Sequence, residues 1–382
     1  MKVLITSRTY VDAKSGLHEQ LDILSNYEDL DLHLFAPKKY KRMLKTYYAK
    51  PEQFSHKKYK VKLSNLFFLR KESALFSYFP FFTYLYKLKP DVIHIEEEPY
   101  SLFCFQIVFF CKIFLPKTKL ILFSWENIFR NRIFPLSFFE KFCLKHGDYA
   151  LPGNEDAMII LRKKGFKKPQ KIVPRYGIDL NKFKKIIDKE LKSKLNLNGK
   201  IIGFIGRLVE DKAIDTLFDA VKRLKEPYTL VLVGDGPLRN EIVKLAKKLG
   251  IDENIRYIKT VNYVDIPKYI SLFDVFVLPS RSMPKWKEQF GHVLIEAMAC
   301  EVPIIGSDSG EIPNVIADAG LVFHENDSDE LYNQIKKVLE NNDFKKNLIE
   351  KGLKRVKDFT YHKIVEQYYE TYKKLYNENK SP

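Results

Sequence analysis

Cysteine, tryptophan and acidic residues are scarce in this sequence. The 382 residues include four cysteines and two tryptophans, and 48 Asp and Glu face 65 Lys and Arg, which gives a formal net charge of +17. The cysteines show neither CxxC pairing nor metal-ligand spacing with histidine, which argues against a disulfide framework and favours a reducing, cytoplasmic compartment. The basic excess predicts attraction to a polyanion, which could be a nucleic acid, an anionic membrane surface or a phosphorylated substrate.

Long apolar runs are missing as well. The first residues, MKVLITSRTY, lack the apolar core of about 7–15 residues that secretion requires, and we expect a first strand there. The longest apolar segment, residues 100–116, is interrupted by Gln106 and Lys112 and is shorter than the roughly 20 residues that a spanning helix needs. We therefore expect a buried or interfacial helix there, and a cytoplasmic protein that is at most peripheral on the inner face of the membrane.

Short apolar runs alternate with helical patterns along the chain. This alternation predicts an α/β fold with two doubly wound parallel sheets in two Rossmann-like domains. The chain is 45% hydrophobic and long enough to bury two cores. We place the domains at residues 1–178 and 179–359, with a proline- and glycine-containing linker over residues 172–185. The predicted strands are residues 3–7, 32–36, 92–96, 120–124 and 149–152 in the first domain, and 201–206, 229–234, 255–259, 275–279 and 303–307 in the second.

The loops after the strands of the second domain carry the candidate ligand-binding residues, because ligands of open α/β sheets bind at the carboxyl ends of the strands. Arg207 directly follows one strand, and Lys212 stands near the start of the next helix. Two cations at a helix N-terminus suit a diphosphate, although a solvated surface pair is the alternative. Gly234 ends the next strand, where glycine lets the backbone approach a ligand. The loop after residue 259, with Val261, could hold a nucleobase through backbone groups, and the base stays open.

The segment EQFGHVLIEAMAC, residues 288–300, sets two glutamates eight residues apart. On one continuous helix Glu288 and Glu296 would lie roughly 12 Å apart along the axis, too far to serve one small group. A loop over residues 288–290 and a helix that begins near Gly291 would solve this, because the free N–H groups of the first turn then point at the place that the loop surrounds. Glu296 could then accept hydrogen bonds from a diol such as a ribose, and its apolar neighbours make burial without a partner costly.

These segments together resemble the retaining glycosyltransferases of the group-1 family with the GT-B fold, also called glycosyltransferase family 4. The resemblance rests on GRLVEDKAID (206–215), VGDGP (233–237), EQFGHVLIEAMAC (288–300) and SGEIP (309–313), which cover most of the second half. The first half matches more loosely, through the loop around Gly16, KPDVIHIEEEPYS (89–101) and YGID (176–179). The resemblance implies two Rossmann-like domains that face a central cleft. It also implies that the acceptor binds to the first domain, the donor to the second, and that the C-terminal helix, residues 360–382, packs back on the first.

The resemblance further implies a reaction. A hexose-type sugar would pass from a UDP- or GDP-sugar to an acceptor, for example a lipid-linked saccharide or a polysaccharide precursor, with retention of configuration and without a metal or other cofactor. Arg207 and Lys212 would bind the diphosphate, Glu296 the ribose and Glu288 the sugar, so the implied catalytic residues are Glu288, Arg207 and Lys212. The implied donor-binding residues are Gly16, Arg207, Lys212, Gly234, Val261, Glu288, Gln289, Phe290, Gly291, His292 and Glu296.

The sequence departs from the family at two places. Ala213 follows Lys212 where the family usually has glycine, and we expect the lysine to stay in place. In LFSWENIFRN (122–131), Trp125, Glu126 and Asn127 occupy a loop that contains a histidine in many relatives. We expect Glu126 or Asn127 to contact the donor sugar or the acceptor. At the end of another strand we expect at least two of the acids in EEE, residues 96–98, to be solvated.

The sequence is also compatible with other functions. Residues 38–62 contain ten Lys and Arg against the single acid Glu52, and residues 75–86 are mostly aromatic. Basic residues beside aromatic ones fit attachment to anionic lipid, but core helices with solubilising lysines explain them equally well. A nucleic-acid partner is not expected, because no helix-turn-helix, zinc-finger or RNA-binding signature accompanies the charge. A nucleotide-sugar epimerase-like GT-B enzyme and a non-catalytic nucleotide-sugar-binding protein are the alternatives.

Overall fold

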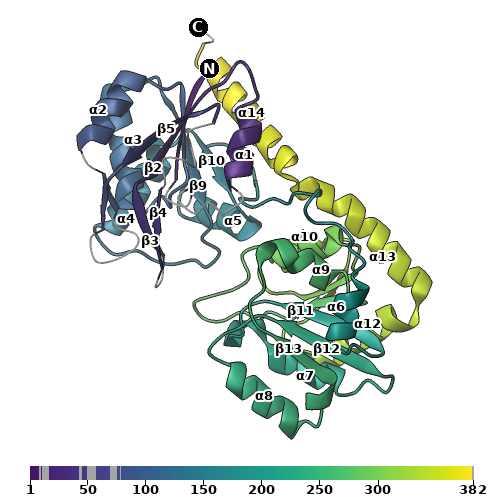
Figure 1. Cartoon of the computed structure of the whole chain (residues 1–382). Helices are drawn as coiled ribbons and strands as arrows, with labels where there is room; N and C mark the ends of the chain where they lie inside the picture. Colours follow the sequence, from purple (N-terminus) through teal and green to yellow (C-terminus); the bar gives the residue numbers. More distant parts are fainter. Residues whose placement is uncertain are drawn as a thin grey trace. The chain divides into compact units, whose positions relative to one another are not determined.

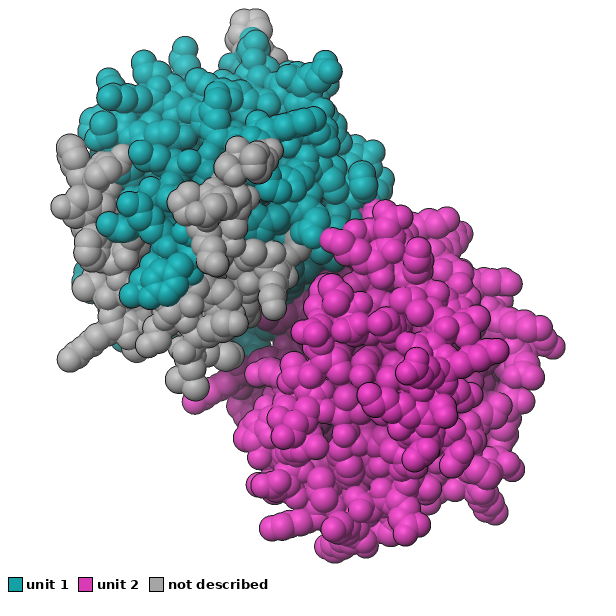
Figure 2. Space-filling model, in the orientation of Figure 1, with its two compact units in different colours: residues 1–177, 361–382 teal, residues 178–360 magenta. Residues whose placement is uncertain are grey.

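The chain forms two compact α/β units, which Figure 2 shows in different colours. This computed structural model describes residues 1–7, 10, 17–42, 45–49, 57–68, 75–77 and 79–380. Unit 1 consists of Met1–Gly177 and Tyr361–Pro382, and unit 2 of Ile178–Thr360. Gly16 lies outside the described residues, as do parts of the basic stretch 38–62 and of the aromatic run 75–86.

Unit 1 is built on a six-stranded parallel sheet in the order β10-β9-β8-β1-β2-β5 (Figure 1). The order is that of a Rossmann sheet, and it reverses between β1 and β8, the place at whose carboxyl ends open α/β sheets generally bind ligands. Two short hairpins, β3–β4 and β6–β7, stand outside this sheet. The strands of unit 1 are β1 (Lys2–Thr6), β2 (Asp31–Pro37), β3 (Lys39–Arg42), β4 (Lys45–Tyr48), β5 (Lys60–Ser64), β6 (Leu66–Phe68), β7 (Leu75–Ser77), β8 (Val92–Ile95), β9 (Lys119–Ser124) and β10 (Tyr149–Pro152).

Helices cover both faces of this sheet because alternate strand residues point to opposite sides. In β1, Val3 and Ile5 pack in the core that contains the buried side chains of α1 and α14, whereas Leu4 packs with those of α2, α3, α4 and α5. The helix that ends the chain, α14, thus belongs to the core of unit 1. The helices are α1 (Leu17–Leu24), α2 (Phe79–Leu88), α3 (Leu102–Phe114), α4 (Leu136–His146), α5 (Glu155–Lys163) and α14 (Tyr361–Glu378).

A buried polar network joins β8 to α14 and to the segment before the unit boundary. The Nδ1 atom of His94 lies 2.7 Å from the hydroxyl of Tyr372, and the Arg175 guanidinium lies 3.0 Å from the Glu96 carboxylate. Both Glu96 and Glu97 are buried, so the expectation that two of the three acids in EEE are solvated is wrong. The reason for Glu96 is a cation 79 residues away in the sequence, Arg175, which neutralises it.

His94 should make unit 1 sensitive to acid. Burial lowers its pKa from 6.5 to about 4, so the unfolded chain binds a proton in this range that the folded unit excludes. The stability that neutral His94 allows is therefore complete above pH 6.5. As the pH falls towards 4, the free energy of unfolding drops by about 3 kcal/mol. We expect urea unfolding, followed by Trp125 fluorescence in a Trp286→Phe background, to show this slope. The slope should flatten in His94→Gln, and an equal slope in both proteins would contradict the assignment.

Unit 2 repeats the same sheet order, β13-β12-β11-β14-β15-β16, with all strands parallel. Its order reverses between β11 and β14. The strands are β11 (Lys200–Ile205), β12 (Tyr228–Val233), β13 (Ile255–Ile258), β14 (Val275–Leu278), β15 (Ile304–Ser307) and β16 (Leu321–Phe323). All ten predicted strands are present within one or two residues at each end, and the edge strands β5 and β16 are additions that the sequence pattern did not predict.

The helices of unit 2 carry apolar residues towards its sheet and charged ones towards solvent, as the buried residues of α7 and α12 show. No helix in the part of the chain that the structure describes combines the length and the apolar character that crossing a bilayer requires. The helices are α6 (Lys189–Lys194), α7 (Ile214–Val221), α8 (Arg239–Lys248), α9 (Ile266–Ile270), α10 (His292–Ala299), α11 (Ile312–Ile316), α12 (Ser328–Glu340) and α13 (Asn342–Arg355).

Candidate functional site

The loops after β11 and β14 meet where the strand order of unit 2 reverses, and they bring Lys212 and Glu288 together. The Lys212 Nζ atom lies 2.5 Å from Glu288 Oε2 and donates to Ser280 Oγ over 3.3 Å. The Ser280 hydroxyl in turn donates to the same carboxylate oxygen over 3.1 Å. In the sequence, Lys212 is 76 positions and Ser280 is 8 positions away from Glu288. The three side chains form a closed cluster at the carboxyl ends of adjacent strands, which is where open α/β sheets bind ligands.

The position of Lys212 is fixed from several sides. A 3-10 turn at Glu210–Lys212 carries it, and Ala213 follows with a φ of 46°, a left-handed conformation that favours glycine. The ammonium lies 4.5 Å from the centroid of the Trp286 ring and 3.9 Å from Asp211 Oδ2. Lys212 is only 8% exposed. A buried cation held between a ring and carboxylates loses little freedom when an anionic group joins it.

The segment EQFGHVLIEAMAC forms a loop followed by a helix. Gly291 precedes α10 with a φ of 78°, and the helix begins at His292, one residue after the predicted start. Glu296 is buried in the second turn of α10, and the Nδ1 atom of His292 lies 3.1 Å from its Oε1. Phe290 is buried against Phe359. The loop therefore places Glu288 beside Lys212, whereas the Glu296 side chain is buried and lies beside His292 of the same helix.

The loop before α11 contacts the backbone of Glu288 and holds it in place. Glu311 N–H donates to the Glu288 carbonyl over 3.0 Å. A Cβ on Gly310 would lie 2.0 Å from this same carbonyl oxygen, and Gly310 also has a φ of 55°. Only glycine permits this approach. The neighbouring Ser309 hydroxyl lies 3.2 Å from the Ser282 hydroxyl, so the loops after β14 and β15 are joined by side chains as well.

The other predicted residues of unit 2 differ in their exposure and in their contacts. Arg207 is exposed at the end of β11, and Gln289 is exposed in the loop before α10. Val261 is half-buried after β13. At Gly234 a Cβ would lie 1.9 Å from the Gly206 carbonyl oxygen, so this glycine admits the backbone of the loop after β11. The close approach that we expected for a ligand is occupied there by the protein itself.

The predicted residues of unit 1 lie after β9. Glu126 pairs with Arg132 and lies 2.7 Å from Lys164 Nζ, and Asn127 is buried. The Trp125 N–H donates to Glu98 Oε1 over 2.8 Å, and Ser124 Oγ donates to Glu98 Oε2 over 2.9 Å. Burial nevertheless raises the pKa of the Glu98 carboxyl to about 7. The structure thus gives Glu126 two cationic partners within unit 1.

Sequence reasoning missed Ser280, Trp286 and Gly310. Ser280 could have been found, because it stands two residues after β14 at the predicted ligand-binding edge. Trp286 could not, because a ring beneath an ammonium is a contact between loops that no spacing reveals. Among the described residues, no group of three or more His, Cys, Asp or Glu is arranged to hold a metal ion.

Comparison with known proteins finds similarity to a family of glycosyltransferases over part of unit 2. The family model described as glycosyl transferases group 1 matches residues 186–355, inside unit 2. The N-acetyl-alpha-D-glucosaminyl L-malate synthase of Bacillus anthracis is 33% identical over 155 residues, which are 40% of this chain and 39% of the relative. The O-antigen chain mannosyltransferase B of Escherichia coli is 30% identical over 177 residues, 45% of each chain. The chain thus spans less than half the length of these relatives.

Solved structures extend the likeness to both units. The HepE protein of Anabaena in complex with UDP has a TM-score of 0.75 at 17% identity and covers 98% of this chain, with 100% of its own. The sucrose-phosphate synthase of Thermosynechococcus elongatus has a TM-score of 0.70 at 19% identity, over 99% of this chain and 100% of its own. Similarity at this identity concerns the fold alone, and it confirms the predicted GT-B fold.

Proposed function

We propose that the protein is a retaining glycosyltransferase, on the premise that residues 186–355 match the family model described as glycosyl transferases group 1. In this proposal unit 2 binds a nucleotide-sugar, a UDP- or GDP-linked hexose, and the sugar passes to a saccharide acceptor. The observation that carries the proposal is the Lys212–Ser280–Glu288 cluster at the ends of β11 and β14.

Lys212 is the proposed ligand for the diphosphate. An ammonium has three N–H donors, and Glu288 and Ser280 take two of them, so one remains for a phosphate oxygen. Arg207, exposed at the end of β11, supplies a second cation, and the N-terminus of α10 adds backbone N–H groups. Glu288 then faces the hydroxyl groups of the sugar, and Glu296 is the proposed partner of the ribose.

The proposed chemistry is electrostatic. When the bond between the anomeric carbon and the diphosphate breaks, negative charge develops on the departing oxygen, and fixed cations stabilise it without reorganising. Lys212 and Arg207 would do this work with no metal ion required. The bound diphosphate would then accept the proton of the acceptor hydroxyl that attacks the same face, which keeps the configuration of the anomeric carbon. A lipid-linked saccharide or polysaccharide precursor is the acceptor class that we propose, with unit 1 as its binding domain.

A donor panel tests this proposal. We expect the purified full chain to release UDP or GDP slowly from at least one UDP- or GDP-linked hexose, because water can replace a missing acceptor. Binding of the same donor should raise the melting temperature of the protein. The configuration of a transferred sugar, read by proton NMR, should match that of the donor.

The outcomes separate the alternatives. Thermal stabilisation without turnover, even with saccharide acceptors, would favour a non-catalytic nucleotide-sugar-binding protein. Conversion of the donor into an isomeric nucleotide-sugar would favour the epimerase-like enzyme. Neither stabilisation nor turnover with any donor of the panel would contradict the proposal.

A further inference from the structure

Helix α3, the first turn of α4 and the segment that leads into α4 expose an unusual concentration of apolar side chains. Half of the large apolar residues that are exposed in the described part of the chain fall between residues 109 and 138. Ile133 is 82% and Phe134 80% exposed. We call this surface the aromatic face, and its residues are Phe109, Ile113, Phe114, Phe129, Ile133, Phe134 and Phe138. A soluble surface rarely leaves such a group without a partner.

The aromatic face is continuous across the two helices. Phe105, Phe109 and Ile113 recur every four residues and so lie along one side of α3. The Phe105 ring lies 5.6 Å from that of Phe138, and the Phe109 ring 6.0 Å from that of Phe142, between centroids. Figure 1 shows α3 and α4 side by side on one face of the sheet. The opposite side of α3 already fills the core of unit 1 through Cys104, Ile107 and Cys111.

Basic residues outnumber acidic ones around this face. Residues 102–147 contain seven Lys and Arg and two acids, Glu126 and Glu140. Both acids are occupied, because Lys164 Nζ lies 2.7 Å from each carboxylate and Arg132 pairs with Glu126. Lys117, Lys141 and Lys145 are exposed. The surroundings of the aromatic face are therefore basic, with no acid of this segment left without a cation.

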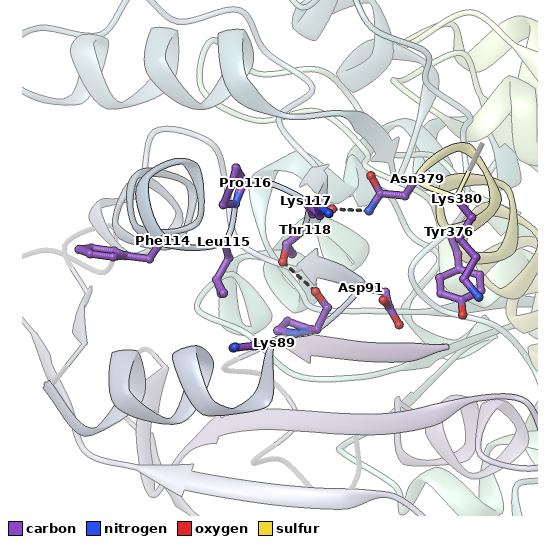
Figure 3. Close-up of a pocket in the computed structure, with 11 residues that line it drawn as sticks. Lys89, Asp91, Phe114, Leu115, Pro116, Lys117, Thr118, Tyr376, Asn379 and Lys380 are labelled. Atoms are coloured by element: carbon purple, nitrogen blue, oxygen red, sulfur yellow. Dashed lines mark hydrogen bonds between the residues drawn. The ribbon is translucent and has the colours of Figure 1, made fainter. Parts of the chain in front are cut away.

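A basic pocket adjoins the end of this face. Phe114, at the last residue of α3, also lines a cavity of about 480 Å³ before the start of β8 and β9. Lys89, Lys117 and Lys380 line it together with one carboxylate, Asp91, whose Oδ2 accepts a hydrogen bond from Lys2 N–H over 2.7 Å (Figure 3). The rim is fixed, because Thr118 Oγ1 donates to the Pro90 carbonyl over 2.7 Å and Asn379 Nδ2 donates to the Lys117 carbonyl.

We propose that the aromatic face is a binding surface for an anionic phospholipid bilayer, with a lipid phosphate in the adjoining basic pocket. Aromatic and aliphatic side chains at a protein surface enter the boundary between headgroups and acyl chains, and nearby lysines attract anionic lipid. A second copy of the chain fits less well, because a two-fold contact would set the same basic residues against each other. This surface differs from the predicted one over residues 38–62 and 75–86, parts of which lie outside the described residues.

Vesicle flotation of the full chain tests the proposal. We expect binding to vesicles that contain phosphatidylglycerol and none to pure phosphatidylcholine, with binding weakened by salt. Ile133→Ser/Phe134→Ser should lower the partition coefficient by at least about tenfold. Because Ile187 and Val264 of unit 2 are 80% and 78% exposed, Ile187→Ser/Val264→Ser is a matched control and should bind as the parent does. Lys117→Gln/Lys380→Gln should weaken binding roughly tenfold and reduce its salt dependence.

Several results would overturn the proposal. They are absence of binding to anionic vesicles at low salt, binding that Ile133→Ser/Phe134→Ser leaves unchanged, and an equal loss in the two serine double variants. A dimer in solution that Ile133→Ser/Phe134→Ser converts to a monomer would assign the face to a second copy. Binding of the lysine double variant equal to that of the parent would remove the pocket from the proposal.

Discussion

Lys212→Ala is expected to lower turnover of the nucleotide-sugar donor by roughly a hundred- to a thousand-fold. The substitution removes the ammonium that lies 2.5 Å from the Glu288 carboxylate, and with it the proposed stabiliser of the departing diphosphate. Release of UDP or GDP under saturating donor, followed in a coupled assay, measures the effect. Glu288→Ala should reduce turnover to a similar extent, because it removes the proposed sugar ligand and leaves Lys212 without its carboxylate.

A matched control for Lys212→Ala exists at the amino ends of the strands of the same sheet. Lys345 Nζ lies 2.6 Å from Asp274 Oδ1, and Asp274 directly precedes β14. Lys345→Ala therefore breaks a similar pair in unit 2 but at the amino ends of the strands, away from the proposed donor site. We expect it to leave turnover unchanged. Equal turnover in Lys212→Ala and the parent, or an equal loss in Lys345→Ala, would refute the role of Lys212.

Gly310→Ala is expected to destabilise unit 2 by about 2 kcal/mol or more and to lower donor turnover at least tenfold. The new Cβ would stand 2.0 Å from the Glu288 carbonyl oxygen, so either this carbonyl or the loop before α11 must move. The hydrogen bond from Glu311 N–H to that carbonyl would be lost with it. Thermal unfolding followed by Trp286 fluorescence in a Trp125→Phe background measures the first effect.

Gly250→Ala separates backbone strain from the clash. Gly250 has a φ of 71°, but a Cβ there would meet nothing within 4 Å. This variant should show only the smaller penalty of a left-handed alanine, about 1 kcal/mol, and normal turnover. If Gly310→Ala behaved like Gly250→Ala, the loop before α11 would not hold Glu288 in place.

Much of the fold could be predicted because it depends on local patterns. Buried parallel strands are short apolar runs between turn residues, and these runs gave ten of the twelve strands of the two sheets. The two missed strands are edges. β5, KVKLS, alternates lysine with apolar residues and lies within the basic stretch 38–62, whereas β16 has only three residues. Neither carries an apolar run of about four or more residues, the length that is typical of a strand buried on both faces.

The site could be predicted in part, for a similar reason. The loop and helix around Gly291 follow from a local conflict, because two glutamates eight residues apart cannot share a target on one helix. The contact between Lys212 and Glu288 joins loops 76 residues apart, and its direct ion pair was not predicted. The expectation that at least two of the acids at residues 96–98 are solvated is wrong for a similar reason, since Arg175, the partner of Glu96, is distant in the sequence. A charged residue whose partner is distant in the sequence cannot be distinguished, from the sequence alone, from a charged residue that is solvated.

Isothermal titration of UDP and of GDP into the full chain tests the central claim most directly, because it needs neither the sugar nor the acceptor. The account predicts that at least one of them binds the parent, and that Lys212→Ala weakens this binding by tenfold or more, as expected for the loss of a buried charged hydrogen bond to phosphate. Lys345→Ala should bind as the parent does. Equal affinity of all three proteins, or binding of neither nucleotide, would contradict the assignment of the Lys212–Glu288 cluster as the donor site.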